Sequence, residues 1–236
     1  MPFHLVKWYA DVVAPDGRYA IGYWAELRQA SLRIRYASLI EGAPSSPAAA
    51  RTTLRPGPEP GIDHWHEPKL AAAWRFLPSA PPFEQTLLTT NQGHVRWHCL
   101  APAAQVVMNR IAGRGYLERI ELTIPPWRLP IQTLLWGRLL TPGHSLVWIE
   151  WHGAHPLRLT LSDGQPVPQP FPELCSFDNA TTIRQGPIGP GILRAIPGLP
   201  APVQLLQIHE HKLLSRARLH HPPGEGWAIH ETVNWP

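Results

Sequence analysis

The sequence predicts an all-β protein with little helix, built as an antiparallel barrel or as two packed β halves. The 29 prolines and 18 glycines among 236 residues interrupt the chain too often for many long helices. Only 16% of the residues are charged, against about 25% in typical soluble domains, which disfavours amphipathic surface helices. Short aromatic and β-branched runs recur between turn residues, as they do in antiparallel barrels and sandwiches.

The first expected strand alternates apolar and polar residues from Val6 to Val12 and ends at the turn Pro15-Asp16-Gly17. Strands over Tyr19–Gln29 and Leu32–Ile40 follow, because both runs are rich in aromatic and β-branched residues. Residues 44–61 are rich in proline and alanine. Such a composition cannot build a core alone, so this segment is expected to be a loop.

Turn residues divide the remainder of the chain into further strands. These are expected at or within Ile62–Glu67, Ala72–Leu77, Phe83–Arg110, Gly113–Ile124, Ile131–Leu140, Ser145–Gly153, Pro156–Leu161, Ser176–Arg184, Val203–His220 and Gly226–Val233. Pro102 is expected at a bulge or corner, because proline cannot donate to a strand ladder. We divide the chain into an N-terminal β half, residues 1–110, and a C-terminal β half, residues 111–236.

Charge and cysteine content limit the classes of partner. The net charge is +4, and no basic run is dense enough to follow a phosphate backbone, so no nucleic-acid partner is expected. Cys99 and Cys175 lie in apolar surroundings, which favours buried free thiols in a reducing compartment. Without a recognisable leader or a long apolar run, we expect a cytoplasmic protein without a transmembrane segment and with at most transient membrane-surface contact.

Parity along the strand that contains Glu118 separates a dry face from a wet one. Tyr116, Glu118 and Leu122 share one face, whereas Arg119 and Glu121 share the other. Glu118 is therefore expected to point inward, where a carboxyl must be paired, hydrogen-bonded or neutral. An ion pair that only braces the barrel is the alternative.

Two other strands carry polar residues beside tryptophans. Trp136 and Arg138 share one face of their strand, and Trp148, Glu150 and His152 share a face of the next. Which face of residues 145–153 is internal stays open, because both are aromatic. One interpretation is an interior lined by Tyr116, Trp136 and Trp148, with Glu118, Arg138 and Glu150 as its few polar groups. Such a cavity suits lipophilic ligands, and aromatic faces stabilise developing positive charge.

Histidines supply further candidates. His98, His230 and Glu231 are expected to contact a ligand or to act as acid–base groups, unless they are hydrogen-bonded structural residues. The pairs His64/His66 and His209/His211 lack the further spacing of a metal motif, so neither a metal nor a cofactor is expected. No nucleophile elbow, phosphate-binding loop or dinucleotide fingerprint occurs in the chain.

The block GRGYLERIELTIPPWRLPIQTLLWGRLLTPGHSLVWIEWHG, residues 113–153, resembles the carotenoid 1,2-hydratase (hydroxyneurosporene synthase) family and its lipocalin-like relatives. They share a G-x-G-Y-x-E strand, then W-G-R, then a V-W-I strand, and the tail GWAIHETVNWP is similar to their closing strand. The resemblance implies a lipocalin-like (calycin) fold and an apolar, terpenoid- or polyketide-like substrate that is hydrated, cyclised or closed in a pericyclic step. The positions that match the motifs are Tyr116, Glu118, Trp136, Arg138 and Trp148.

These observations favour an enzyme that acts on a hydrophobic polyene, terpenoid or polyketide-like compound. Glu118 would donate the proton, or alternatively Glu150 or Glu231, and Arg138 would set the electrostatics. The alternative function is a non-catalytic carrier of a lipophilic small molecule. A third alternative is a structural module in which the inward polar pairs only fix the strand register.

Overall fold

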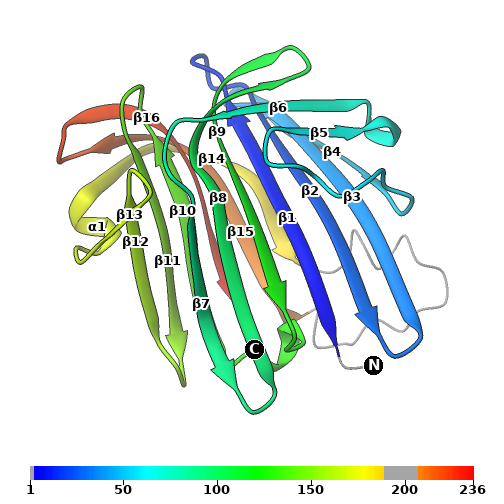
Figure 1. Ribbon diagram of the computed structural model, residues 1–236. Coiled ribbons are helices and arrows are strands. Elements are labelled where there is room, and N and C mark those ends of the chain that lie inside the picture. The colour runs from blue at the N-terminus through cyan, green and yellow to red at the C-terminus, as the bar shows by residue number, and fades with distance from the viewer. Residues whose placement is uncertain (1–2, 189–206) are drawn as a thin grey trace. The chain divides into compact units, whose positions relative to one another are not determined.

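The computed structural model describes residues 3–188 and 207–236, and the chain forms two compact units, Met1–Pro126 and Trp127–Pro236. Each unit is built around one antiparallel sheet (Figure 1). Within the described ranges the helices are the 3-10 turns η1 (Pro68–Leu70) and η2 (Pro126–Arg128) and the short helix α1 (Phe171–Leu174). The all-β prediction is confirmed.

The N-terminal sheet follows the order β4-β3-β2-β1-β9-β8-β6-β5, and β7 also pairs with β8. Its strands are β1 (His4–Val13), β2 (Tyr19–Gln29), β3 (Leu32–Ala43), β4 (Ser46–Thr53), β5 (His64–Glu67), β6 (Ala72–Pro78), β7 (Phe83–Thr90), β8 (Gly93–Met108) and β9 (Ile111–Leu122). The division expected after residue 110 falls in the turn between β8 and β9. Because β9 pairs with both β1 and β8, it belongs to the N-terminal unit.

Pro102 lies at a corner of β8, as the sequence predicted. The register of β8 with β9 shifts on both sides of Ala101. Before the corner β8 pairs with β7, as far as Cys99, and after it β8 pairs with β6, from Ala104. A residue that cannot donate a ladder hydrogen bond is accommodated where the strand changes partner.

The expected loop at residues 44–61 requires a correction. Its first part forms strand β4, which pairs with β3, and only the residues after Thr53 form a loop. β4 pairs on one side only and ends the sheet, and Pro47 lies where its register with β3 shifts, so proline is accommodated there. Low apolar content therefore misled the prediction, since an exposed edge strand needs no core-facing side chains.

The C-terminal sheet follows the order β13-β12-β11-β10-β16-β15-β14. Its strands are β10 (Ile131–Leu140), β11 (Ser145–Gly153), β12 (Leu157–Ser162), β13 (Gln165–Val167), β14 (Cys175–Pro187), β15 (His209–Leu219) and β16 (Gly224–Asn234). The predicted hairpin has the expected bounds as β10 and β11. Residues 203–206 of the expected strand Val203–His220 lie outside the described residues.

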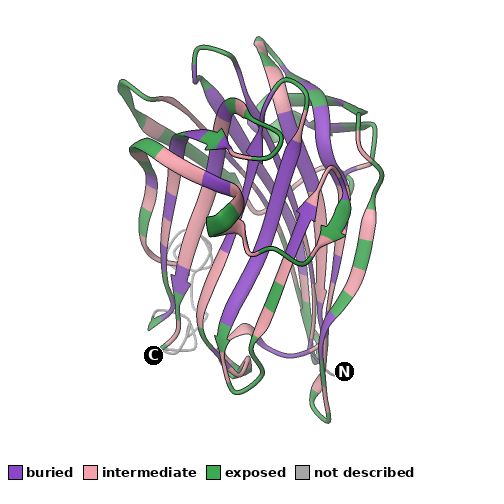
Figure 2. Ribbon diagram, turned by 90° about the vertical axis from the view of Figure 1, so that its left-hand side faces the viewer, coloured by how far each residue is buried: buried purple, intermediate pink, exposed green. Residues whose placement is uncertain are grey.

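Each sheet packs one face into a core of its own unit. In the N-terminal unit, small residues of the sheet such as Ala10, Ala20 and Ala104 lie under Trp65 and Trp74 of the short strands β5 and β6. In the C-terminal unit the core contains these buried residues, with α1 packed against them: Leu139, Leu146, Trp148, Cys175, Ala217, Leu219 and Ala228. Figure 2 shows long buried stretches along the strands and exposed residues at the turns.

The opposite face of each sheet is buried as well. Asp11 and Tyr116 of the N-terminal sheet are fully buried on the face that is turned away from the core of that unit. Arg138 and Lys212 are buried on the corresponding face of the C-terminal sheet. Polar residues on these two faces are therefore withdrawn from water and must find partners.

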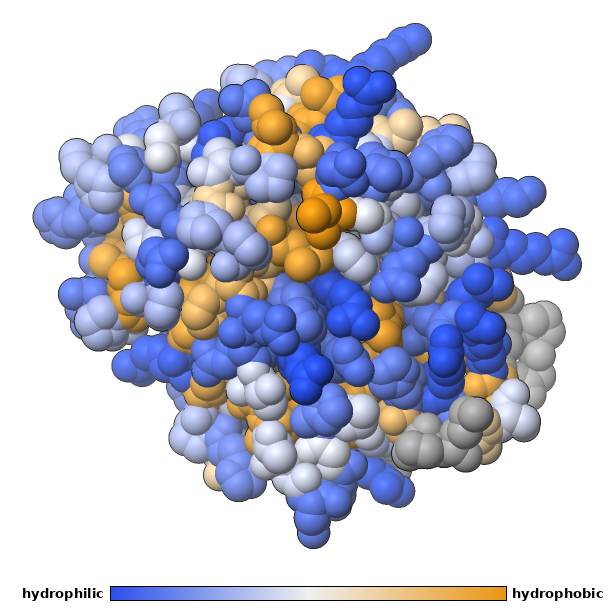
Figure 3. Space-filling model, viewed as in Figure 1, coloured by the Kyte–Doolittle hydropathy of each residue, from blue (hydrophilic) through white to orange (hydrophobic). Residues whose placement is uncertain are grey.

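The surface is hydrophilic over most of the face shown in Figure 3, with scattered hydrophobic side chains. The large hydrophobic residues that are exposed in the described part of the chain are Ile62, Leu77 and Val107. Within the same residues, no helix has the length and apolar character that crossing a membrane would require.

Candidate functional site: a hydrogen-bonded carboxyl and two groups of polar residues

Glu118 on β9 accepts two short hydrogen bonds on one oxygen. The Trp97 indole Nε1 and the Tyr116 hydroxyl each donate to Glu118 Oε2 at 2.6 Å. Glu118 lies opposite Cys99 on β8 and opposite Tyr9 on β1, so the ladder on both sides fixes its position. Parity therefore brought Glu118 and Tyr116 together on one face, as the sequence indicated.

The surroundings of Glu118 include two tyrosines and a buried cysteine. Tyr116 is fully buried, which raises the pKa of its phenol well above the usual value, and negative charge at Cys99 and Glu118 would raise it further. Burial also raises the pKa of the Cys99 thiol. Tyr116 thus remains a phenol and a hydrogen-bond donor at neutral pH. Beside it, the Tyr9 hydroxyl donates to the buried carboxylate of Asp11 at 2.9 Å.

The other face of β9 carries solvated ion pairs. Arg119 Nη1 lies 3.3 Å from Glu121 Oε2, and His4 Nε2 lies 3.0 Å from Glu121 Oε1. The side chains of Arg119 and Glu121 are 24% and 20% exposed. Glu118 and Glu121 are both half-buried on the same strand but lie on opposite faces and have different partners, which makes Glu121 a matched control for Glu118.

A carboxyl with both donors on one oxygen can exchange a proton. In the acid form, Oε2 serves as the carbonyl oxygen that accepts both hydrogen bonds, and Oε1 carries the proton. In the ionised form, the same two bonds stabilise the negative charge. Both forms of the carboxyl are therefore compatible with the same two hydrogen bonds.

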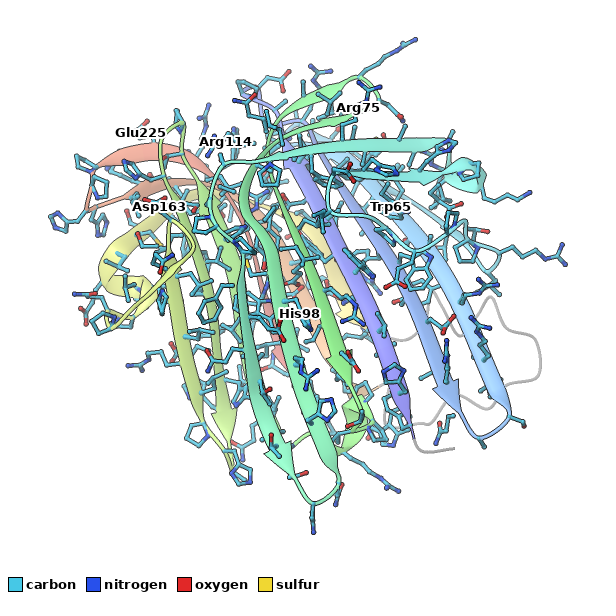
Figure 4. The ribbon with its side chains drawn as sticks, viewed as in Figure 1. Trp65, Arg75, His98, Arg114, Asp163 and Glu225 are labelled. Carbon is cyan, nitrogen blue, oxygen red and sulfur yellow. The ribbon has the colours of Figure 1, made fainter. Side chains whose placement is uncertain are left out.

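His98 does not join Glu118. It lies on β8 between Trp97 and Cys99 and therefore points to the opposite face, as Figure 4 allows the reader to follow. Its Nδ1 lies 3.2 Å from the carboxylate of Glu84, and its buried Nε2 has no hydrogen-bond partner among the described residues. The expected role of His98 in ligand binding stays a prediction.

Trp136 and Arg138 share one face of β10 with two residues of neighbouring strands. Arg138 is fully buried and donates from Nη1 to the carbonyl oxygen of Trp227 at 2.9 Å. Lys212 on β15 is 2% exposed, pairs with the Glu231 carboxylate, and holds its Nζ 5.2 Å from the centre of the Trp136 ring. Sequence analysis missed Lys212. The available signal was the alternation along β15, since Lys212 and Leu214 share one face of this strand and both are buried.

Trp148, Glu150 and His230 lie on the opposite face of the same sheet. Trp148 pairs with Gly137 across the ladder, whereas Arg138 pairs with Val147, so the two candidate residues point to different sides. The sequence interpretation grouped Trp136, Arg138, Trp148 and Glu150 around one interior. The register of the sheet separates them into two pairs.

The residues on this second face have structural partners. Trp148 stacks on Phe171 of α1 with ring centres 4.8 Å apart, and His230 stacks on Phe177 at 4.4 Å. His230 Nε2 lies 3.0 Å from the Ser215 hydroxyl. Burial, and then the positive charges of neighbouring groups, lowers the pKa of His230 to about 4.

Glu150 has two basic neighbours at the margin of that face. Its carboxylate lies 3.3 Å from Arg158 Nε and 3.4 Å from His152 Nε2. The side chains of Arg158 and His152 are more than half exposed. The ion pair with Arg158 gives Glu150 a structural partner.

The two H-x-H pairs turn their histidines outward. His64 and His66 are exposed while Trp65 between them is buried, and His209 is exposed while Glu210 is buried. Over the described residues, no three side chains of the His, Cys, Asp or Glu type converge as a metal site would require.

Neither a protein family nor a curated protein sequence matches the chain. Its fold is similar to that of CghA in complex with Sch210972 (TM-score 0.58, 11% identity, 99% of this chain and 89% of that chain). A second CghA structure gives a TM-score of 0.54 with the same identity and coverage. Kievitone hydratase from Nectria haematococca gives 0.49, with 9% identity over 98% and 88% of the two chains. At such low identity, the likeness to CghA shows the fold alone.

Proposed function

We propose that the chain is an enzyme that acts on a hydrophobic polyene, terpenoid or polyketide-like compound by hydration, cyclisation or isomerisation. The observation that carries this proposal is the half-buried Glu118, which receives two 2.6 Å hydrogen bonds from Trp97 and Tyr116 on one oxygen. The similarity of residues 113–153 to carotenoid 1,2-hydratases supports the same chemistry. So does the fold likeness to CghA, a protein whose structure was solved with the small molecule Sch210972.

In this mechanism Glu118 transfers its proton to a carbon–carbon double bond of the substrate. A new C–H bond forms, the π bond breaks, and a carbocation faces the carboxylate that remains. As negative charge develops on Glu118, the hydrogen bonds from Trp97 and Tyr116 become charge-assisted and strengthen. The two donors therefore stabilise the transition state more than the ground state, which is the condition for catalysis.

The cation then has three fates that preserve atom balance. Attack by water followed by proton loss gives a hydrated product. Attack by a second double bond of the same molecule, followed by proton loss, gives a cyclised product. Direct loss of a different proton gives an isomer. In each case the Glu118 carboxylate is the base that recovers the proton, so the enzyme returns to its starting state.

The other candidate residues receive different roles in the proposal. We keep Tyr116 as an aromatic contact of the substrate beside Glu118. Trp136 and Arg138 belong to the C-terminal unit, and their expected roles stay predictions from the sequence. Glu231 pairs with Lys212, and Glu150 pairs with Arg158, so both are poorer proton donors than Glu118. We assign Trp148 and His230 no leading role as ligand contacts in the proposal, because each ring already stacks on a phenylalanine.

The test uses a panel of unsaturated terpenoid, polyene and polyketide compounds incubated with the protein in D2O, followed by chromatography and mass spectrometry. Hydration adds the mass of D2O, isomerisation introduces deuterium, and cyclisation in which Glu118 adds one hydron and removes another also introduces deuterium. Glu118→Gln keeps the shape of the side chain but removes the acid, so product should disappear. Glu121→Gln, on the solvated face of the same strand, should retain turnover.

Two results would contradict the proposal. Product formation by Glu118→Gln at the rate of the unaltered protein would remove Glu118 from the mechanism. Stoichiometric quenching of tryptophan fluorescence, with every bound ligand recovered chemically unchanged, would favour the non-catalytic carrier instead.

A further inference from the structure

A small polar cavity lies in the C-terminal unit, within the ends of β14, β15 and β16. Its volume is about 220 Å³, and it is lined by Asp178, Asn179, Arg216, Ala217, Arg218 and Glu225. Glu225 is labelled in Figure 4. At about 30 Å³ per water molecule, this space corresponds to roughly seven waters, so a compact ligand fits.

The cavity opens where β14 is irregular. The register between β14 and β15 shifts after Asp178, and Asn179 adopts a positive φ of 49°. A bulge with a left-handed residue bends the strand and re-aims its side chains. The cavity therefore lies where the ladder of β14 and β15 changes register.

The charged groups of the cavity are not all paired. Arg218 Nη2 lies 3.2 Å from the Glu225 carboxylate, so this pair satisfies itself. Arg216 and Asp178 lie opposite each other across the ladder. Nevertheless, no ion pair within 4.0 Å joins either of them to any group in the described part of the chain.

Trp227 explains why Arg216 does not reach Asp178. Arg216 pairs with Trp227 on its other side, and its guanidinium lies 4.3 Å from the centre of the indole ring. Stacking holds the guanidinium toward β16 and away from β14, while its N–H groups stay available in the plane of the fork. A fixed cation and a separate carboxylate therefore border one cavity.

We propose that this cavity binds a compact zwitterion of the amino-acid class. Its carboxylate pairs with the guanidinium of Arg216, and its ammonium group pairs with Asp178. A simple anion would meet the negative charge of Asp178, and a simple cation would meet Arg216, so only a ligand with both charges satisfies the two groups.

The experiment measures NMR shifts of the Arg216 Nε–H and Trp227 indole N–H signals during titration of the whole protein. The probes are glycine, β-alanine and γ-aminobutyrate, which differ in charge separation, together with propionate and propylammonium as half-ligands. We expect saturable shifts with one of the zwitterions, and at least about tenfold weaker binding of both half-ligands.

Variants separate a site from a general effect of charge. Arg216→Ala and Asp178→Asn alter exposed side chains, and each should weaken binding of the zwitterion about tenfold or more. Arg51→Ala, an exposed arginine paired with Glu41 in the N-terminal unit, should leave binding unchanged. The proposal is overturned if no probe shifts the two signals, if propionate binds as tightly as the zwitterions, or if both variants bind like the unaltered protein.

Discussion

Replacing Gly137 with alanine tests whether Trp148 is a packed core residue or a wall of a ligand cavity. A Cβ at position 137 would lie 2.2 Å from Trp148 Cζ2 and 2.7 Å from His230 Cβ. Both distances are below 3.0 Å, which real Cβ atoms essentially never show, so Trp148 has to move. Trp148 is 2% exposed and stacks on Phe171, so its movement disturbs the contact with α1.

The expected cost follows from the amount of overpacking. Forcing additional atoms into a packed core typically costs about 1–3 kcal/mol. For a chain of this length, each kcal/mol lowers the Tm by about 2–4 °C, so Gly137→Ala should lower it by roughly 2–12 °C. Because glycine replacement also restricts the unfolded chain, which is worth about 0.4–1 kcal/mol in the opposite direction, a second alanine variant is needed.

Gly143→Ala is the matched control, because a Cβ at that position has no atom within 4 Å. Thermal and urea unfolding, followed by circular dichroism, would compare the two variants with the unaltered protein. We expect Gly143→Ala to match or slightly exceed the stability of the unaltered protein and Gly137→Ala to fall below it. Equal stability of the two variants would refute the reasoning, since it would mean that Trp148 moves without cost and can make room for a ligand.

Three further outcomes follow from the geometry. The pKa of His230 is lowered from 6.5 to about 4, so the unfolded chain binds the proton first, and the free energy of unfolding should fall by up to about 3 kcal/mol as pH drops from 6.5 to 4. Urea unfolding of His230→Gln should show a smaller fall over the same pH range. Parallel pH curves for this variant and the unaltered protein would contradict this. Burial raises the pKa of Cys175 to about 12 and that of Cys99 above its usual range. Neither thiol should therefore react with a disulfide reagent near pH 8 before the protein unfolds. Rapid labelling of the native protein would disprove this prediction. On the proposed function, Tyr116→Phe removes one of the two donors to Glu118, so kcat should fall on the order of a hundredfold with little change in KM; an unchanged kcat would exclude this role.

The sequence predicted the strand pattern well, because turn residues and alternation are local signals. It also placed Tyr116 and Glu118 on one face of β9 and Arg119 and Glu121 on the other. The contrast between a wet and a dry face was too simple, because the second face also carries Leu117, which is buried in the core. The same reasoning was inconclusive for β11, in which both faces are buried from Ser145 to Trp151. A strand buried on both sides is apolar throughout, so parity identifies which residues share a face but not what that face meets.

Other features of the structure have no local signal. β10 pairs with β16, and β1 pairs with β9, across long stretches of chain. These pairings place Lys212 and Glu231 beside Trp136, and Tyr9 beside Glu118. The sequence could identify Glu231 and Trp136 as candidates, but only the strand order shows that a buried lysine joins them. Strand β4 was missed for the opposite reason, because an exposed edge strand lacks the apolar alternation by which strands are recognised.

The position of Glu118 follows from strand register rather than from a loop, and this bears on its proposed chemistry. Its two donors come from β8 and β9, which pair with each other, so one ladder fixes both the carboxyl and the groups that stabilise its charge. A slip of β9 by one residue would turn Glu118 and Tyr116 together to the other face and separate the carboxyl from Trp97. Groups held on regular strands need no reorganisation when charge develops, which is the property that electrostatic catalysis requires of a site.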